Sequence, residues 1–118
     1  MPVRLVVPRT GRVVALRVDR AVTAGARARG LLGRRPLGPG EALVLEPARQ
    51  VHTFGLTYPI DVCFCDRAWR VVHVVSSMPP RRVTRWVRRA RYAVETRAGE
   101  LHGVRPGDQL SLEELNER

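Results

Sequence analysis

The stretch Val51–Asp66, VHTFGLTYPIDVCFCD, carries a histidine, two carboxylates and two thiols within sixteen residues. Its second half, Ile60–Asp66, is rich in β-branched and aromatic residues and follows Pro59, a pattern that predicts a buried strand. Arg70–Ser76 is a second such run after a short turn, so we expect a β-hairpin. His52–Leu56 is predicted to form a further strand before it.

The rest of the chain follows the same pattern of short strands. Further strands are predicted over 3–7, 12–18, 41–46, 92–97 and 109–112. Thr23 can cap a short helix that Gly30 or Gly33 ends, and 98–104 suits one more helical turn. The segment 78–92 suits either an arginine-rich helix or an extended run that starts at Pro79. We therefore expect a mainly β, compact single domain over 1–118, a sandwich or barrel-like fold with one or two short helices.

The amino-acid composition limits the classes of protein to which the chain can belong. An apolar fraction of 44% fits a globular chain and argues against disorder. The net charge of +10 comes from 21 basic residues, all arginine and none lysine, which is typical of coding sequence rich in G and C. Such a surface attracts polyanions. No apolar run is long enough for a signal-peptide core or a membrane helix, and two cysteines are too few for a disulfide framework, so a cytoplasmic location is expected.

Short motifs in a fixed order resemble one known family. The matching pieces are Arg29–Arg34 (RGLLGR), Gly40–Leu43 (GEAL), His52–Leu56 (HTFGL), Tyr58–Val62 (YPIDV), Phe64, Asp66, Arg91–Glu95 (RYAVE), Ala98–Gly99 and Gly107–Asp108. Together they cover about 12–112, and in this order they are similar to the bacterial and archaeal family catalogued as domain of unknown function number one hundred and ninety-two. The resemblance implies a compact β-sandwich or barrel-like domain with no assigned activity. Many relatives carry an export signal.

Two departures from the family pattern are visible. Leu32 and Leu56 stand where relatives often have methionine, a change that conserves volume. Trp69 stands in the hairpin turn where relatives usually have glycine. The last residue of a three-residue hairpin loop normally has a positive φ, which costs a non-glycine residue about 1 kcal/mol. Either the turn changes type, which is the expectation, or packing holds Trp69 in place.

The thiols are the first chemical candidates. Cys63 and Cys65 lie on one face of the predicted strand, with α-carbons about 6.5 to 7 Å apart, at the limit for a disulfide. A loop over 67–69 would place His73 opposite Cys63 and suggest three zinc ligands. No CxxC pair supplies a fourth ligand, and free cysteine is commonly buried. We expect core packing, with no metal and no cofactor.

His52 and Asp61 are the second candidates. A carboxylate beside an imidazole orients it and raises its basicity, so the pair suits a hydrolase-like enzyme. Nothing marks a neighbouring hydroxyl as a nucleophile, however, and no catalytic residue is assigned. Arg29 could pair with Asp61 through a bidentate contact. We therefore expect His52, Asp61 and Arg29 to line a ligand-binding concavity.

The third candidate is an arginine stretch. Its six members are Arg81, Arg82, Arg85, Arg88, Arg89 and Arg91. They alternate with Trp86 and end beside Tyr92, a mixture that suits an acidic protein, an anionic membrane surface or, less favoured, nucleic acid. A solvated face in an arginine-biased chain is the plain alternative. The sequence thus predicts a binding or accessory module for an acidic partner or small anionic ligand, with no evident enzyme chemistry.

Overall fold

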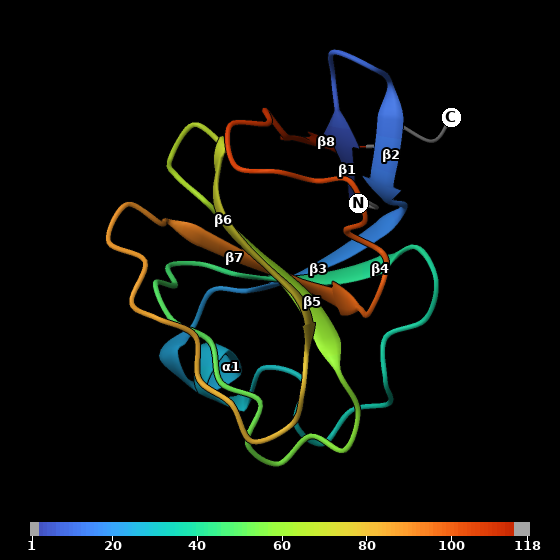
Figure 1. The fold of residues 1–118 in the computed structure, drawn as a ribbon. Coiled ribbons are helices and arrows are strands. Elements are labelled where there is room, and N and C mark those ends of the chain that lie inside the picture. The colour runs from blue at the N-terminus through green and yellow to red at the C-terminus, as the bar shows by residue number, and fades with distance from the viewer. Residues whose placement is uncertain (1–2, 115–118) are drawn as a thin grey trace.

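Residues 3–114 of the computed structural model form two β-sheets and one short helix (Figure 1). The strands are β1 (Val3–Val7), β2 (Arg12–Ala15), β3 (Arg17–Ala21), β4 (Glu41–Leu45), β5 (Ile60–Cys65), β6 (Val71–Met78), β7 (Tyr92–Arg97) and β8 (Ser111–Glu114). The helix α1 (Ala24–Arg29) lies between β3 and β4. Within residues 3–114, no helix is long and apolar enough to span a bilayer.

The two sheets differ in size and direction. The smaller sheet has the antiparallel order β2-β1-β8, and the larger has the order β3-β4-β7-β5-β6. In the larger sheet β3 and β4 are parallel, whereas β4–β7, β7–β5 and β5–β6 are antiparallel. A parallel pair needs a crossover connection, and the segment that contains α1 provides it.

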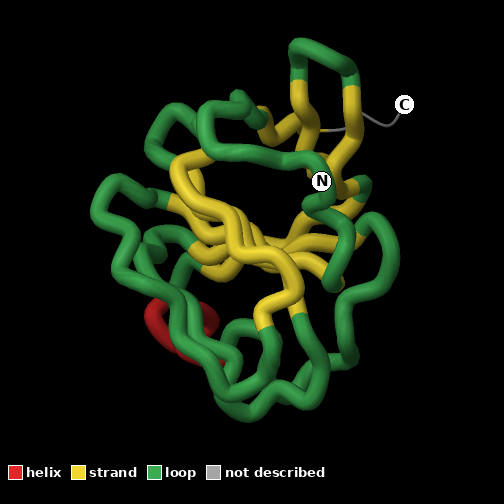
Figure 2. The backbone as a smooth tube through the Cα atoms, in the orientation of Figure 1, coloured by secondary structure: helices red, strands yellow, loops and turns green. Residues whose placement is uncertain are grey.

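The larger sheet is covered on both faces, which gives the domain two cores. One face packs on the smaller sheet through residues such as Leu5, Val44 and Cys63. The other face, with Leu43 and Phe64, packs on residues from the loops. Figure 2 shows the helix and long loops on that second side. Because both faces are covered, every residue of β5 is buried.

The mainly β, single-domain prediction is confirmed, and so is the helix with its caps. The Thr23 hydroxyl accepts a hydrogen bond from the Ala26 amide at 3.1 Å, and Gly30 ends the helix with φ of 51°. The backbone amide of Gly30 in turn donates to the Ala26 carbonyl.

Several predicted element boundaries are wrong. The run 12–18 is divided at Leu16, which is 62% exposed, so that β2 and β3 belong to different sheets. The segment 52–56 is not a strand, because only His52 pairs, through one bridge to Val83. The segment 98–104 forms turns in place of a helical turn, and the last strand begins at Ser111.

The hairpin turn keeps the positive φ that is normal at the end of a three-residue loop, contrary to the expectation of a reshaped turn. Trp69 has φ of 64°, and its amide donates to the Asp66 carbonyl at 3.0 Å. The Asp66 carboxylate accepts hydrogen bonds from the amides of Ala68 and Arg70. Packing therefore holds a bulky residue where glycine would be relaxed.

Candidate functional site

A pocket opens between α1 and the segment 50–56, on the loop-covered face of the larger sheet. Its volume is about 390 Å³ including the open mouth. The apolar lining residues are Leu31, Leu32, Leu45, Val51, Phe54 and Leu56, and the polar ones are Arg27, Arg29, Gln50, His52 and Glu95. The pocket thus combines an apolar wall with a small set of polar groups, as ligand sites generally do.

Thr53 fixes the wall that contains His52. This threonine is fully buried, its hydroxyl donates to the Pro79 carbonyl at 2.6 Å, and it accepts from the Arg82 amide at 2.9 Å. Beside it, the Val51 amide donates to the Thr84 hydroxyl at 3.0 Å. These bonds tie the segment 51–53 to the loop between β6 and β7, so exposed His52 and Phe54 stand on a fixed backbone at the pocket rim.

Gly55 explains part of the HTFGL motif. Its φ is 90°, and a β-carbon added there would come within 2.6 Å of a Leu32 methyl group. The glycine therefore permits both the turn and the close approach of Leu32. Leu32 and Leu56, the two positions where relatives often have methionine, both line this pocket.

Glu95 is the buried acid of the site. It lies on β7 between Leu43 and Val62 on the neighbouring strands, and it is 4% exposed. Because strand side chains alternate, it shares the loop-covered face with Ala93. Burial in this apolar environment raises the pKa of Glu95 to about 8, and the opposing influence of the Arg34 charge is smaller. Glu95 is accordingly a neutral acid at pH 7.

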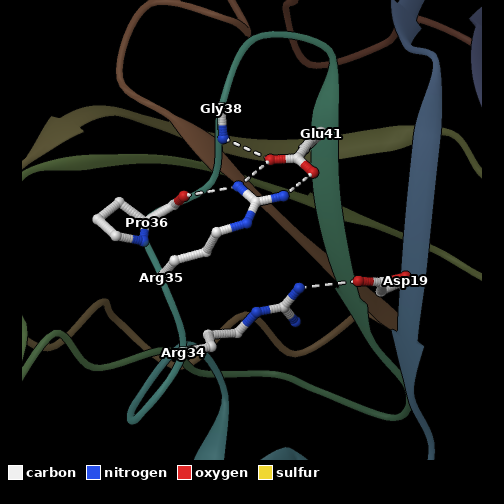
Figure 3. Close-up of polar contacts among 6 residues, drawn as sticks. All are labelled: Asp19, Arg34, Arg35, Pro36, Gly38 and Glu41. Carbon is white, nitrogen blue, oxygen red and sulfur yellow. Dashed lines mark hydrogen bonds and ion pairs between the residues drawn. The ribbon is translucent and has the colours of Figure 1, made fainter.

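Arg34 does not neutralise Glu95 because it pairs elsewhere. Its guanidinium contacts the Asp19 carboxylate at 2.8 Å (Figure 3). The neighbouring Arg35 makes a two-point contact with Glu41, which also accepts from the Gly38 amide. The Arg35 hydrogen bond, followed by the Gly38 amide, lowers the pKa of Glu41 to about 2.

Three buried polar atoms among the described residues make no hydrogen bond. They are Oε1 of Glu95, Nε of Arg27 and the hydroxyl of Tyr58. Burial, and then the Glu95 charge, raises the pKa of Tyr58, so the phenol and the carboxyl are electrostatic neighbours. Buried polar atoms normally have partners, and Glu95 and Arg27 both line the pocket. They are groups that a bound ligand could satisfy.

The three residues predicted to share a concavity are divided by the structure. His52 and Arg29 line the pocket, whereas Asp61 does not. The Arg29 guanidinium donates to the carbonyls of Leu32 and Gly33, so the expected Arg29–Asp61 pair is not formed. His52 accepts from the Phe54 amide through Nδ1, and the expected His52–Asp61 pair is also not formed.

Asp61 occupies the opposite face of the larger sheet. Its strand neighbours Ile60 and Val62 belong to the loop-side core, so alternation turns Asp61 toward the smaller sheet. It is 2% exposed and accepts hydrogen bonds from the amides of Ser77 at 2.7 Å, Gly99 at 2.9 Å and Leu101 at 3.1 Å. Asp61 thus organises the turn after β7.

The thiols and His73 are also placed differently from the zinc arrangement. A bulge after Phe64 sets His73 opposite Phe64 and Val74 opposite Cys63. Cys63 and Cys65 are both fully buried and unoxidised, with their sulfur atoms 3.9 Å apart. Across residues 3–114, no group of three or more His, Cys, Asp and Glu side chains could hold a metal ion.

The arginine stretch is neither helical nor part of a sheet. The loop between β6 and β7 is irregular, and Val83 makes its only bridge among the described residues. Arg81, Arg82, Arg85, Arg88 and Arg89 are exposed, and Arg91 is half-buried. Trp86 is 60% exposed beside them.

Together, the fold and the pocket define a mainly β domain with a small pocket on the loop-covered face of its larger sheet. The chain belongs to the DUF192 family, described as Uncharacterized ACR, COG1430, whose pattern matches residues 5–112. No curated protein matches it.

Two solved structures share the fold. A protein of unknown function from Novosphingobium aromaticivorans superposes with a TM-score of 0.78 at 22% identity, over 94% of this chain and 84% of that one. A protein from Sinorhizobium meliloti, described as a proposed transcription regulator, superposes with a TM-score of 0.76 at 26% identity, over 92% of this chain and 90% of that one.

Glu95 is the site residue that sequence reasoning missed. As an isolated carboxylate at the end of RYAVE, it resembles a surface residue. One signal could have found it: in a strand over 92–97, alternation places Glu95 on the same face as Ala93, and its immediate neighbours Val94 and Thr96 are uncharged.

Proposed function

We propose that this domain is a binding module for a small carboxylate-bearing ligand with an apolar body. The observation that carries the proposal is Glu95, a buried acid with an unpartnered oxygen in the pocket. A carboxyl group held neutral by burial is a hydrogen-bond donor. The neutral carboxyl can donate a hydrogen bond to a ligand carboxylate, whereas an ionised carboxylate has no proton to donate.

The other polar groups favour the same ligand chemistry. The buried Nε of Arg27 is a second donor, and it has no acceptor within residues 3–114. Arg29 adds positive charge, and its side chain is held by the carbonyls of Leu32 and Gly33. The guanidinium groups of Arg27 and Arg29 attract an anion and repel a cation. An amine ligand is therefore disfavoured, even though the Glu95 carboxyl forms part of the site.

The apolar lining residues limit the size of the ligand and favour one with an apolar body. Six of the lining residues are leucine, valine or phenylalanine. Because the volume of about 390 Å³ includes open solvent at the mouth, the enclosed space is smaller than that of ordinary ligand pockets. The ligand must therefore be small, with a short aliphatic chain or a single ring that stays partly exposed at the mouth.

Binding is favoured over hydrolysis because of what lines the pocket. The described lining residues include no serine, threonine or cysteine, and Asp61 lies across the sheet from His52. The Sinorhizobium protein with this fold is described as a proposed transcription regulator. Recognition of a small ligand is a property that a regulator could use, and this supports a binding role.

The experiment is a titration of ¹⁵N-labelled protein with benzoate and hexanoate, followed by amide chemical shifts. Shifts are expected at Gly30, Leu32 and His52, with benzylamine and benzyl alcohol binding at least about tenfold more weakly. Because Glu95 ionises near pH 8, benzoate affinity is expected to fall about tenfold or more between pH 6.5 and pH 9.

Variants separate the site from the rest of the fold. Glu95→Gln retains a donor and should bind benzoate without that pH dependence, whereas Glu95→Leu should lose binding. Glu100→Gln is the matched control, because Glu100 pairs with Arg97 and does not line the pocket. Preferential binding of benzylamine, or the absence of shifts with every carboxylate, would refute the proposal.

A further inference from the structure

Within residues 3–114, the arginines of the loop between β6 and β7 make no ion pair with a carboxylate. Residues 3–114 contain five ion pairs, which involve Arg4, Arg20, Arg34, Arg35 and Arg97. None of them includes an arginine of the 81–91 stretch. The positive charge of this loop is therefore uncompensated within the described chain, while the arginines elsewhere carry all of its carboxylate contacts.

Five arginines surround one hollow of the surface. They are Arg49, Arg67, Arg88, Arg89 and Arg91, and the hollow has a volume of about 740 Å³ including its open mouth. Among the described residues that line it, Asp66 is the single acid, and its Oδ1 already accepts hydrogen bonds from two backbone amides of the hairpin turn. The hollow thus gathers a large excess of positive charge in a concave surface, which focuses the field on an anion.

The backbone around the hollow is fixed by hydrogen bonds. The Arg91 amide donates to the Cys65 carbonyl at 2.7 Å, and the Ala48 amide donates to the Arg91 carbonyl at 3.1 Å. The Arg49 side chain donates from Nε to the Arg88 carbonyl at 3.1 Å. Buried Val87 and Ala90 anchor the loop in the loop-side core. The guanidinium groups are therefore attached to a rigid frame, although the loop has no regular structure.

Two more hollows adjoin this one and extend it into a track. Arg88 and Arg89 also line a hollow with Arg85, and Arg49 also lines a hollow with Trp86 beside α1. Trp86 lines that last hollow together with Ala24, Arg27 and Ala28 of α1, so the loop lies beside the helix. We use the name arginine track for Arg49, Arg67, Arg85, Arg88, Arg89, Arg91 and the adjoining Trp86.

We propose that the arginine track binds single-stranded nucleic acid, with phosphates at the guanidinium groups and a base stacked on Trp86. Guanidinium forks match phosphate oxygens, and an exposed indole is a stacking platform for any base. The Trp86 hollow adjoins the Glu95 pocket through Arg27 and Gln50, but no residue of the arginine track lines that pocket. The proposal therefore does not depend on the carboxylate ligand.

The shape of the track selects this partner over the others that its charge admits. A membrane surface is flat and would meet protruding side chains, whereas these arginines line hollows. An acidic peptide would use the charge but not the indole face. A single strand is thin and flexible enough to place successive phosphates in adjoining hollows and a base between them.

The test is fluorescence anisotropy of a labelled oligodeoxythymidylate of about 20 nucleotides, titrated with the full chain at about 50 and 200 mM NaCl. Binding should weaken at least about tenfold between the two salt concentrations. Arg88→Gln combined with Arg89→Gln should weaken it about tenfold and reduce the salt slope by between one and two. Trp86→Ala should weaken binding about fivefold or more.

A charge-matched control distinguishes the track from net charge alone. Arg9→Gln combined with Arg17→Gln removes the same charge from exposed arginines outside the three hollows. This variant should bind within about twofold of the parent. Vesicles of phosphatidylcholine with phosphatidylserine, and polyglutamate, form the comparison arms. Tighter binding to either of these, equal loss in both double variants, or no oligonucleotide binding at low salt would overturn the proposal.

Discussion

Trp69 stacks on Tyr92 with ring centroids 3.9 Å apart and ring planes 9° from parallel. Trp69 ends the β5–β6 hairpin turn at φ of 64°, and Tyr92 begins β7, the strand that pairs with β5 on the other side. The stack joins the turn to the neighbouring strand. It explains how a tryptophan persists in a backbone conformation that favours glycine.

Two substitutions at Trp69 separate backbone strain from stacking. Trp69→Ala loses the stack but retains a β-carbon at positive φ, so the free energy of unfolding should fall by about 2–4 kcal/mol. Trp69→Gly loses the same stack but relieves the strain, so it should be about 1 kcal/mol more stable than the alanine variant. Urea unfolding at pH 7 measures both.

The control for this pair is Trp86→Ala, at a tryptophan that is 60% exposed. It should change the free energy of unfolding by less than about 0.5 kcal/mol. If Trp69→Gly proved less stable than Trp69→Ala, the positive φ at this position would cause negligible strain. Only the stack on Tyr92 would then distinguish tryptophan from alanine here.

Asp61→Asn tests whether Asp61 serves the fold or the ligand. The asparagine side chain would lack the negative charge that accepts hydrogen bonds from three backbone amides. Its own NH₂ group would also face one of those amides, which are donors. The free energy of unfolding should therefore fall by about 2–4 kcal/mol. Asp108→Asn is the milder comparison, because the carboxylate of Asp108 accepts only from the Arg105 amide among the described residues. If the Asp61 variant were as stable as the parent but did not bind benzoate, Asp61 would contribute to ligand binding, as the sequence predicted.

Glu41 should titrate far below an ordinary glutamate. With Arg35 and the Gly38 amide in contact, its pKa is about 2, and carbon-detected NMR of the carboxyl group should show it (Figure 3). Since the folded pKa lies below the unfolded value of 4.5, this contact stabilises the fold above about pH 4.5 and is lost as the pH falls toward 2. Arg35→Gln should raise the pKa of Glu41 toward 4.5, and Arg34→Gln should leave it low.

The sequence identified the strands and helix whose signals are local. Thr23 and Gly30 mark the helix ends by capping chemistry, and β-branched runs mark the central strands. The division at Leu16 has no local signal, because which sheet a strand joins depends on distant partners. The bulge beside Phe64 likewise shifts the register by one residue and moves His73 away from Cys63.

The sequence predicted only part of the site, because the site also depends on pairing between distant segments. His52 and Arg29 belong to distinct motifs and do line one pocket. Asp61 was grouped with them because it is close to His52 along the chain, yet alternation on β5 puts it across the sheet. Glu95 reaches the pocket from a strand more than forty positions beyond His52, through pairing that no short motif encodes.

Glu95 should make the protein less stable as the pH rises toward 8. Its folded pKa of about 8 exceeds the ordinary value of 4.5, so between these values the folded state holds a proton that the unfolded state releases. The stability contributed by the neutral acid is fully present below about pH 4.5 and is lost as the pH rises to about 8, where the folded group ionises. The total loss is about 5 kcal/mol. Glu95→Gln, which cannot ionise, should remove most of this decline in urea unfolding measured from pH 4.5 to 9. The Glu100→Gln control should retain it, and an equal slope in the parent and Glu95→Gln would show that Glu95 is not a buried neutral acid.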